Sequence, residues 1–165
     1  MTKYLIAFIV AGVLLTSAFL FGSSQSVGPS TTSSNNVSAS ILALSEKSFN
    51  FGEISMRDGT VSHTFALTNT GTLPVAIESI STSCMCTEAF LIEGDARTGP
   101  FGMPGHGGKT KISAKIPAGE SREIEVVFDP GAHGPAGIGR ISRAVFIEGV
   151  TGKVETIEIS ATVTP

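Results

Sequence analysis

The sequence predicts an all-β domain with two packed antiparallel sheets, and three observations favour this fold class. Apolar residues in several short segments alternate with polar ones, which is the period of a half-buried strand. Glycine, proline, asparagine and aspartate separate these segments at short intervals. No long stretch after residue 40 keeps the apolar stripe of a helix. Residues 41–165 therefore suit one sandwich domain, in which each sheet buries one face.

The alternation runs through four segments, which in chain order are residues 49–51, 61–68, 122–128 and 156–163, and residues 75–80 form a further strand-like run. In the second of them, Phe65 and Leu67 share one face with Val61. Turn signals lie between the segments, and we interpret residues 69–71 as a hairpin turn and Asp129 as a turn former. His63 occupies an apolar position of its strand, so we expect a core or edge histidine there.

The N-terminal residues predict a membrane-targeting segment. Lys3 is the only charge before the apolar run Tyr4–Gly22, whose length is close to the ~20 residues of a transmembrane helix. We expect residues 1–22 to form a signal-anchor helix, with Lys3 inside and the remaining chain outside the cytoplasm. The protein would then be a single-pass protein of the cell membrane. Cleavage near residues 23–25 would instead yield a secreted domain.

Residues 23–40 predict a flexible linker, because they carry no charge and few large apolar side chains. The folded domain is then expected at residues 41–165. Of the 11 basic residues only Lys3 precedes the apolar run, and the rest are outnumbered by 14 acidic residues. No run of basic residues exists, so nucleic acid is not an expected partner.

The order of several short motifs resembles the bacterial DUF1573 family. The motifs are Phe51-Gly52, Phe65-Ala66-Leu67-Thr68-Asn69-Thr70-Gly71, Pro74-Val75-Ala76-Ile77, Ser83-Cys84-Met85-Cys86-Thr87, Pro117-Ala118-Gly119 and Phe128-Asp129-Pro130. The resemblance implies an immunoglobulin-like β-sandwich related to ASH and major-sperm-protein-like domains, exported and without assigned enzymatic activity. Two departures stand out. Met85 replaces the usual glycine, and residues 93–113 are longer and richer in glycine and proline than the family pattern.

The only two cysteines, Cys84 and Cys86, are one residue apart and follow the segment 75–80. In an extended backbone both sulfurs would project from the same face. Three interpretations of the pair are open: ligation of a soft metal, a disulfide, and packing as small apolar side chains.

Two loops rich in glycine and proline could add further ligands, because each presents a histidine with few neighbours. The candidate metal ligands are Cys84, Cys86, Met103, His106 and His133. Thiolate, thioether and imidazole ligands together favour copper, while zinc takes cysteine and histidine without methionine. The sequence therefore predicts a copper site, with zinc less favoured. The other interpretation leaves both histidines as exposed loop residues.

We interpret Arg140 and Arg143 as a solvated strand face or as ion-pair partners.

No fingerprint of a hydrolase, a metalloprotease, a phosphate-binding loop or a dinucleotide-binding enzyme is present. We therefore expect a non-catalytic, membrane-tethered, extracytoplasmic binding domain with a soft-metal site. The alternative is a purely structural or protein–protein interaction module of the cell envelope, with an envelope protein as its partner and no metal.

Overall fold

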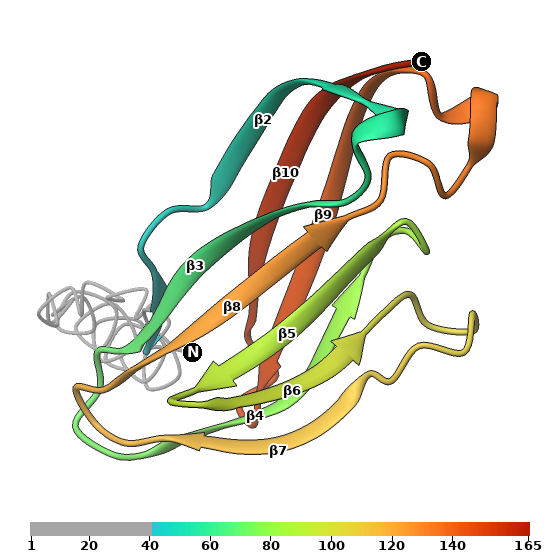
Figure 1. The fold of residues 1–165 in the computed structure, drawn as a ribbon. Coiled ribbons are helices and arrows are strands. Elements are labelled where there is room, and N and C mark those ends of the chain that lie inside the picture. The colour runs from blue at the N-terminus through green and yellow to red at the C-terminus, as the bar shows by residue number, and fades with distance from the viewer. Residues whose placement is uncertain (1–40) are drawn as a thin grey trace, which may run out of the picture. The chain divides into compact units, whose positions relative to one another are not determined.

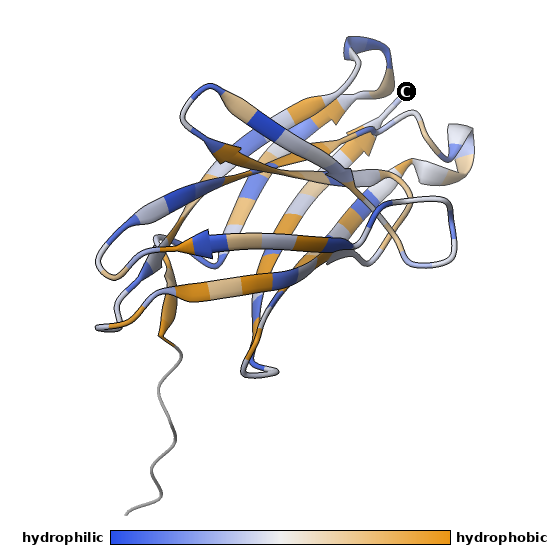
Figure 2. Ribbon diagram, turned by 90° about the horizontal axis from the view of Figure 1, so that it is seen from below, coloured by the Kyte–Doolittle hydropathy of each residue, from blue (hydrophilic) through white to orange (hydrophobic). Residues whose placement is uncertain are grey.

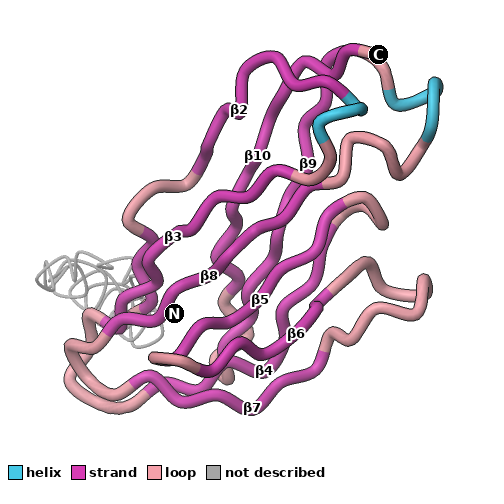
Figure 3. Tube along the Cα trace, in the orientation of Figure 1, coloured by secondary structure: helices cyan, strands magenta, loops and turns pink. Residues whose placement is uncertain are grey.

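Residues 41–165, which are the residues that the computed structural model describes, form two β-sheets that pack face to face (Figure 1). The signal-anchor helix predicted at residues 1–22 and the linker predicted at residues 23–40 lie outside the described residues. Within residues 41–165 the helices are two short 3-10 turns, η1 (Met56–Asp58) and η2 (Gly134–Gly137), as Figure 3 shows. Neither has the length or apolarity to span a membrane.

Each sheet contains five strands. The first sheet has the order β1-β3-β8-β5-β6, formed by Leu42–Leu44, Val61–Asn69, Ser121–Phe128, Thr87–Glu93 and Ala96–Phe101. The second has the order β2-β10-β9-β4-β7, formed by Ser48–Ser55, Val154–Thr164, Gly139–Gly149, Val75–Thr82 and Lys111–Ile116. The predicted all-β sandwich is confirmed, and the four alternating segments and the strand-like run at residues 75–80 all fall within strands.

The core is formed by the alternate side chains that the two-residue period places on the inner faces. Phe65 and Leu67 of β3 have no exposed surface, and neither does Ile124 of β8. Ile157 and Ile159 meet them from the second sheet as members of the same core cluster. Figure 2 shows the corresponding bands of apolar and polar residues along the strands. Burial of these side chains is the main stabilising contribution to the domain.

One strand pair departs from the predicted antiparallel pattern. β2 pairs with β10 in parallel, with Phe49 opposite Ile159, so an entirely antiparallel sandwich was a wrong expectation. The reason is that β2 is followed by η1 and then by β3, which belongs to the other sheet. No tight hairpin therefore fixes the direction of β2 relative to its neighbour.

His63 lies at the edge where β3 approaches β2. Its ring stacks on the Phe49 ring, and its Nε2 atom lies 2.8 Å from a carboxylate oxygen of Glu46. This half-buried position agrees with the expectation of a core or edge histidine.

Asn69 and Asp129 form turns as expected. Asn69 is completely buried, and its side-chain oxygen accepts a hydrogen bond of 2.9 Å from the backbone of Gly71. Asp129 accepts one of 2.8 Å from the backbone of Gly131. The turn at Asn69 leads from β3 in the first sheet to β4 in the second, so it does not close a hairpin.

Candidate functional site

The two cysteines lie in the turn that carries the chain from β4 in the second sheet to β5 in the first. The expectation of an extended backbone at Cys84 and Cys86 was wrong, because β4 ends at Thr82 and β5 begins at Thr87. The turn brings the two Cα atoms to 5.3 Å, inside the usual range for a disulfide.

The backbone of this turn is held from both sides. The Thr82 hydroxyl donates a hydrogen bond of 2.9 Å to the carbonyl of Cys84. The backbone N–H of Asp129 donates one of 2.9 Å to the carbonyl of Cys86. Since Asp129 begins the loop between β8 and β9, this bond joins the cysteine turn to the loop that carries His133.

Cys84 and Cys86 are joined by a disulfide, and the chain contains no other cysteine. Of the three interpretations that the sequence left open, the disulfide is the one that the structure contains. The two sulfurs differ in their surroundings. Cys84 is half-buried, whereas Cys86 is 3% exposed and belongs to the hydrophobic core cluster.

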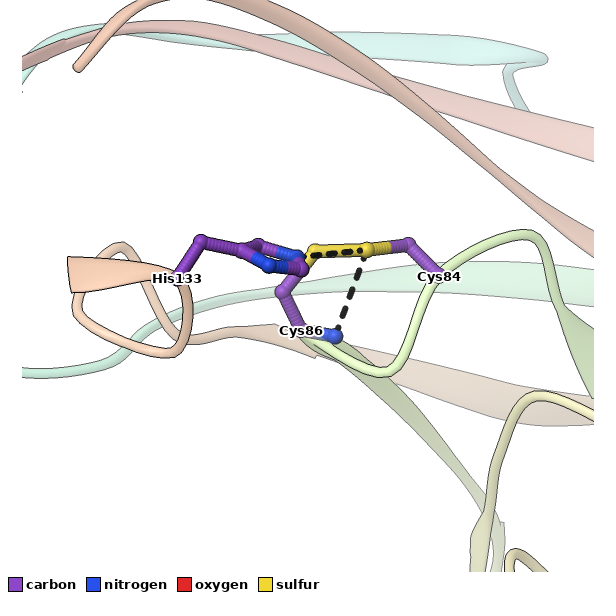
Figure 4. Close-up of side chains that lie close together, drawn as sticks. All are labelled: Cys84, Cys86 and His133. Atoms are coloured by element: carbon purple, nitrogen blue, oxygen red, sulfur yellow. Dashed lines mark hydrogen bonds between the residues drawn. A yellow bond between two sulfur atoms is a disulfide. The ribbon is translucent and has the colours of Figure 1, made fainter. Parts of the chain in front are cut away.

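His133 and Arg143 contact the disulfide, one at each sulfur. His133 places its Nε2 atom 3.2 Å from the Cys84 sulfur, and Figure 4 shows its ring reaching the disulfide from the β8–β9 loop. Arg143 of β9 donates from its Nε atom to the Cys86 sulfur at 3.3 Å. The disulfide thus has an imidazole at its half-buried end and a guanidinium at its buried end.

Sequence reasoning missed the role of Arg143, which is half-buried and forms no ion pair within residues 41–165. A signal was nevertheless present. Arg143 shares the inward-facing positions of β9 with Ile141 and Val145, both of which are buried. An arginine on the apolar face of a strand is uncommon, because its charge requires a partner.

The structure brings together three of the five predicted ligands. One ligand atom each of Cys84, Cys86 and His133 lies within 4.8 Å of the others. Met103 and His106 lie on the loop between β6 and β7, where they line a separate pocket of about 400 Å³ with Met85 and Thr87. His106 is not a member of the three-residue cluster.

Glycines let the β6–β7 loop fold back on itself. The loop is closed by a hydrogen bond of 3.1 Å from the N–H of Gly102 to the carbonyl of Lys109. A Cβ atom at Gly108 would lie 2.7 Å from the Cα atom of Gly102, so two backbone segments meet where no side chain fits. The β4–β5, β6–β7 and β8–β9 loops all lie at the same end of the sandwich (Figure 1).

Two five-stranded sheets packed face to face define a β-sandwich, and a disulfide lies in a turn that crosses between them. Residues 42–99 match the family model described as "Protein of unknown function (DUF1573)". The resemblance inferred from the sequence motifs is thus confirmed for residues 42–99. No curated protein matches the chain.

Solved structures with a similar fold come from diverse sources. A protein of unknown function from Porphyromonas gingivalis W83 is 18% identical with a TM-score of 0.53, and the match covers 74% of this chain and 46% of that one. A family 123 glycoside hydrolase from Clostridium perfringens is 11% identical with a TM-score of 0.51, over 72% of this chain and 23% of that one. The ASH / PapD-like domain 7 of human CEP192 is 14% identical with a TM-score of 0.45, over 75% and 85%. The chain thus spans less than half of the first two proteins, and the likeness to those two shows the fold alone.

Proposed function

We propose that this domain is a non-catalytic, extracytoplasmic binding module, tethered to the membrane by residues 1–22, that binds a soft metal ion in its dithiol form. The observation that carries the proposal is the convergence of Cys84, Cys86 and His133. Their ligand atoms lie within 4.8 Å of one another. Two of these residues come from the β4–β5 turn and the third from the β8–β9 loop, so the fold assembles the cluster from distant parts of the sequence.

The donor set favours copper(I) over zinc. Two thiolates and an imidazole are soft or borderline ligands, and thiolates select copper(I). A structural zinc site requires four protein ligands, and a fourth candidate does not join the cluster among residues 41–165. A bis-thiolate complex of copper(I) carries a net negative charge, which the guanidinium of Arg143 would offset from beside Cys86.

Metal binding requires that the disulfide be reduced, because a metal ligand must be a thiolate and both sulfurs are engaged in the bond. Two molecules of an external thiol, which are oxidised to one disulfide, supply the two electrons and two protons that convert Cys84–Cys86 to the dithiol. The ion then displaces the protons.

The decisive experiment is an anaerobic titration of the full-length, reduced chain with copper(I) in competition with a chromophoric chelator. We expect one ion per chain, with copper–sulfur and copper–nitrogen scattering in the X-ray absorption spectrum. The Cys84→Ser/Cys86→Ser double variant should lose the site. The proposal is wrong if the reduced wild type binds no more copper(I) than that variant does.

A second candidate function is protein–protein contact without metal. It is favoured by two large apolar side chains in turns at the opposite end of the sandwich, Leu73 at 74% exposed and Val150 at 53% exposed. Exposed apolar groups of this kind contribute to protein interfaces. Photo-crosslinking from position 73 in intact cells, in the wild type and in the double cysteine variant, separates the two functions. A crosslinked partner that persists without the cysteines supports the second candidate.

A further inference from the structure

We propose that Cys84–Cys86 is a redox-active disulfide that exchanges with external thiols, with Cys84 as the sulfur attacked and Cys86 as the leaving thiolate. This inference goes beyond metal binding and does not depend on it. Each exchange reduces the Cys84–Cys86 disulfide once. The reaction is therefore stoichiometric, and the domain remains a non-catalytic binding module.

The exposure of the two sulfurs decides which one is attacked. An incoming thiolate must reach its target sulfur along the axis of the disulfide, so access governs the choice. Cys84 is half-buried and adjoins the exposed His133, whereas Cys86 is 3% exposed and sits among core residues. Cys84 is therefore the more accessible of the two cysteines to a thiol from solvent.

The positive charge of Arg143 also favours attack on Cys84 with Cys86 as the leaving thiolate. When Cys84 is attacked, negative charge develops on the Cys86 sulfur, and the Nε atom of Arg143 already lies 3.3 Å from it. The guanidinium is oriented by a second hydrogen bond of 2.8 Å, from Nη1 to the carbonyl of Ser142. An arginine remains positively charged at all physiological pH values.

The charge of Arg143 is also available to the thiolate. No carboxylate within residues 41–165 forms a salt bridge with Arg143. The Thr87 hydroxyl, 3.8 Å from the Cys86 sulfur, adds a polar neighbour on the other side. Exchange is faster when the leaving thiolate is stabilised, because the rate depends on how readily that thiolate leaves. Arg143 lies in position to stabilise it from the start of the reaction.

The reaction balances as follows. A thiolate R–S⁻ forms a bond to the Cys84 sulfur, the Cys84–Cys86 bond breaks, and its electron pair stays on Cys86. A second thiol then attacks the R sulfur of the mixed disulfide and releases Cys84 as a thiolate. The sum is two thiols oxidised to one disulfide and the protein reduced to the dithiol, with the protons of the two thiols transferred to the two cysteines.

The first test maps the attacked sulfur in the wild type. The full-length chain is exposed to reduced glutathione, free thiols are trapped with excess N-ethylmaleimide at mildly acidic pH, and the modified peptides are identified by mass spectrometry. We expect glutathione on Cys84 and the alkyl group on Cys86 in at least a tenfold excess over the reverse pattern. A parallel arm with reduced thioredoxin as the thiol shows whether a protein thiol reacts faster than a small one. Equal labelling of both sulfurs, or reaction only after addition of denaturant, would overturn the proposal.

The second test measures the rate of exchange in arginine variants. We expect Arg143→Gln to slow exchange about tenfold, because a charge interaction at this distance is lost. Arg143→Lys restores a positive charge and should recover most of the rate. Arg140→Gln, which changes an exposed arginine three positions earlier on the same strand, is the matched control and should exchange at the wild-type rate. An unchanged rate in folded Arg143→Gln would also refute the assigned role of the guanidinium.

Discussion

The ring of His63 stacks on the ring of Phe49, with the two centroids 3.5 Å apart and the planes 8° from parallel. His63 belongs to β3 of the first sheet and Phe49 to β2 of the second, so this pair joins the two sheets along one open side. Phe65 adds an edge-on contact to the same imidazole at 4.8 Å, and Glu46 accepts its hydrogen bond.

We expect His63→Ala to lower the free energy of unfolding by about 1–2 kcal/mol, because it removes the stacked pair and the hydrogen bond to Glu46. Urea unfolding of His63→Ala, Phe49→Ala and the double variant gives the coupling energy, which should be about 0.5–1.5 kcal/mol. Ser62→Ala, an exposed neighbour on the same strand, serves as control. A coupling energy of zero would show that the two rings stabilise the domain independently.

Asn69 should be far more sensitive to substitution than its neighbour Thr70. The buried amide of Asn69 donates to the carbonyls of Leu73 and Ile116 at 2.9 Å each, so it joins the β3–β4 turn to the end of β7. Asn69→Ala leaves these carbonyls without their partner and should cost about 2–4 kcal/mol of stability.

Thr70 provides the control, because its hydroxyl makes a single exposed hydrogen bond to the carbonyl of Ile41. Thr70→Ala should cost less than about 1 kcal/mol. Thermal or urea unfolding of the two variants measures the difference. Equal losses would contradict the role of the Asn69 amide as a link between the β3–β4 turn and the end of β7.

Gly108→Ala should open the β6–β7 loop. The added Cβ atom would lie 2.7 Å from the Cα atom of Gly102, and neither backbone segment can yield without breaking the loop closure. We expect a loss of about 1–3 kcal/mol and faster proteolysis within residues 102–109. Gly137→Ala is a suitable control, since its nearest neighbours are 3.4 Å away in ordinary contact. A Gly108→Ala protein that resists proteolysis like the wild type would exclude a tightly closed loop.

Copper(I) affinity should separate the five ligands predicted from the sequence into two groups. We expect His133→Gln to weaken binding by the reduced chain at least about tenfold, because it removes a ligand from the three-residue cluster. His106→Gln and Met103→Leu should leave the affinity unchanged, because these residues line the other pocket. Chelator competition under anaerobic conditions measures all three. The oxidised chain should not bind, and tight binding with an intact disulfide would contradict cysteine ligation.

The strands could be predicted from the sequence because the two-residue period of β3, β8 and β10 is enforced by the core. Phe65, Ile124 and Ile157 must face inward for the sheets to pack, and this requirement is visible in the order of the residues. The parallel pairing of β2 with β10 was not visible, because register and direction between distant strands depend on tertiary packing rather than on local pattern.

The site was only partly predictable for a related reason. Cys84, Cys86 and His133 were singled out by residue type, and the fold brings them together. Met103 and His106 have the same chemical character, yet the direction of a glycine-rich loop cannot be derived from its composition. Arg143 was missed because its role depends on facing Cys86 across the interior, a contact between residues far apart in the chain.

The parallel pairing of β2 has a consequence for how the domain reaches its native state. Ser55 at the end of β2 hydrogen-bonds to Pro165, which is 110 residues further along the chain. While the domain folds, β2 has no neighbour in its sheet until β10 reaches it. Closing such a long loop makes this pairing a late, slow step, during which the exposed backbone of β2 is open to association with other unfolded chains.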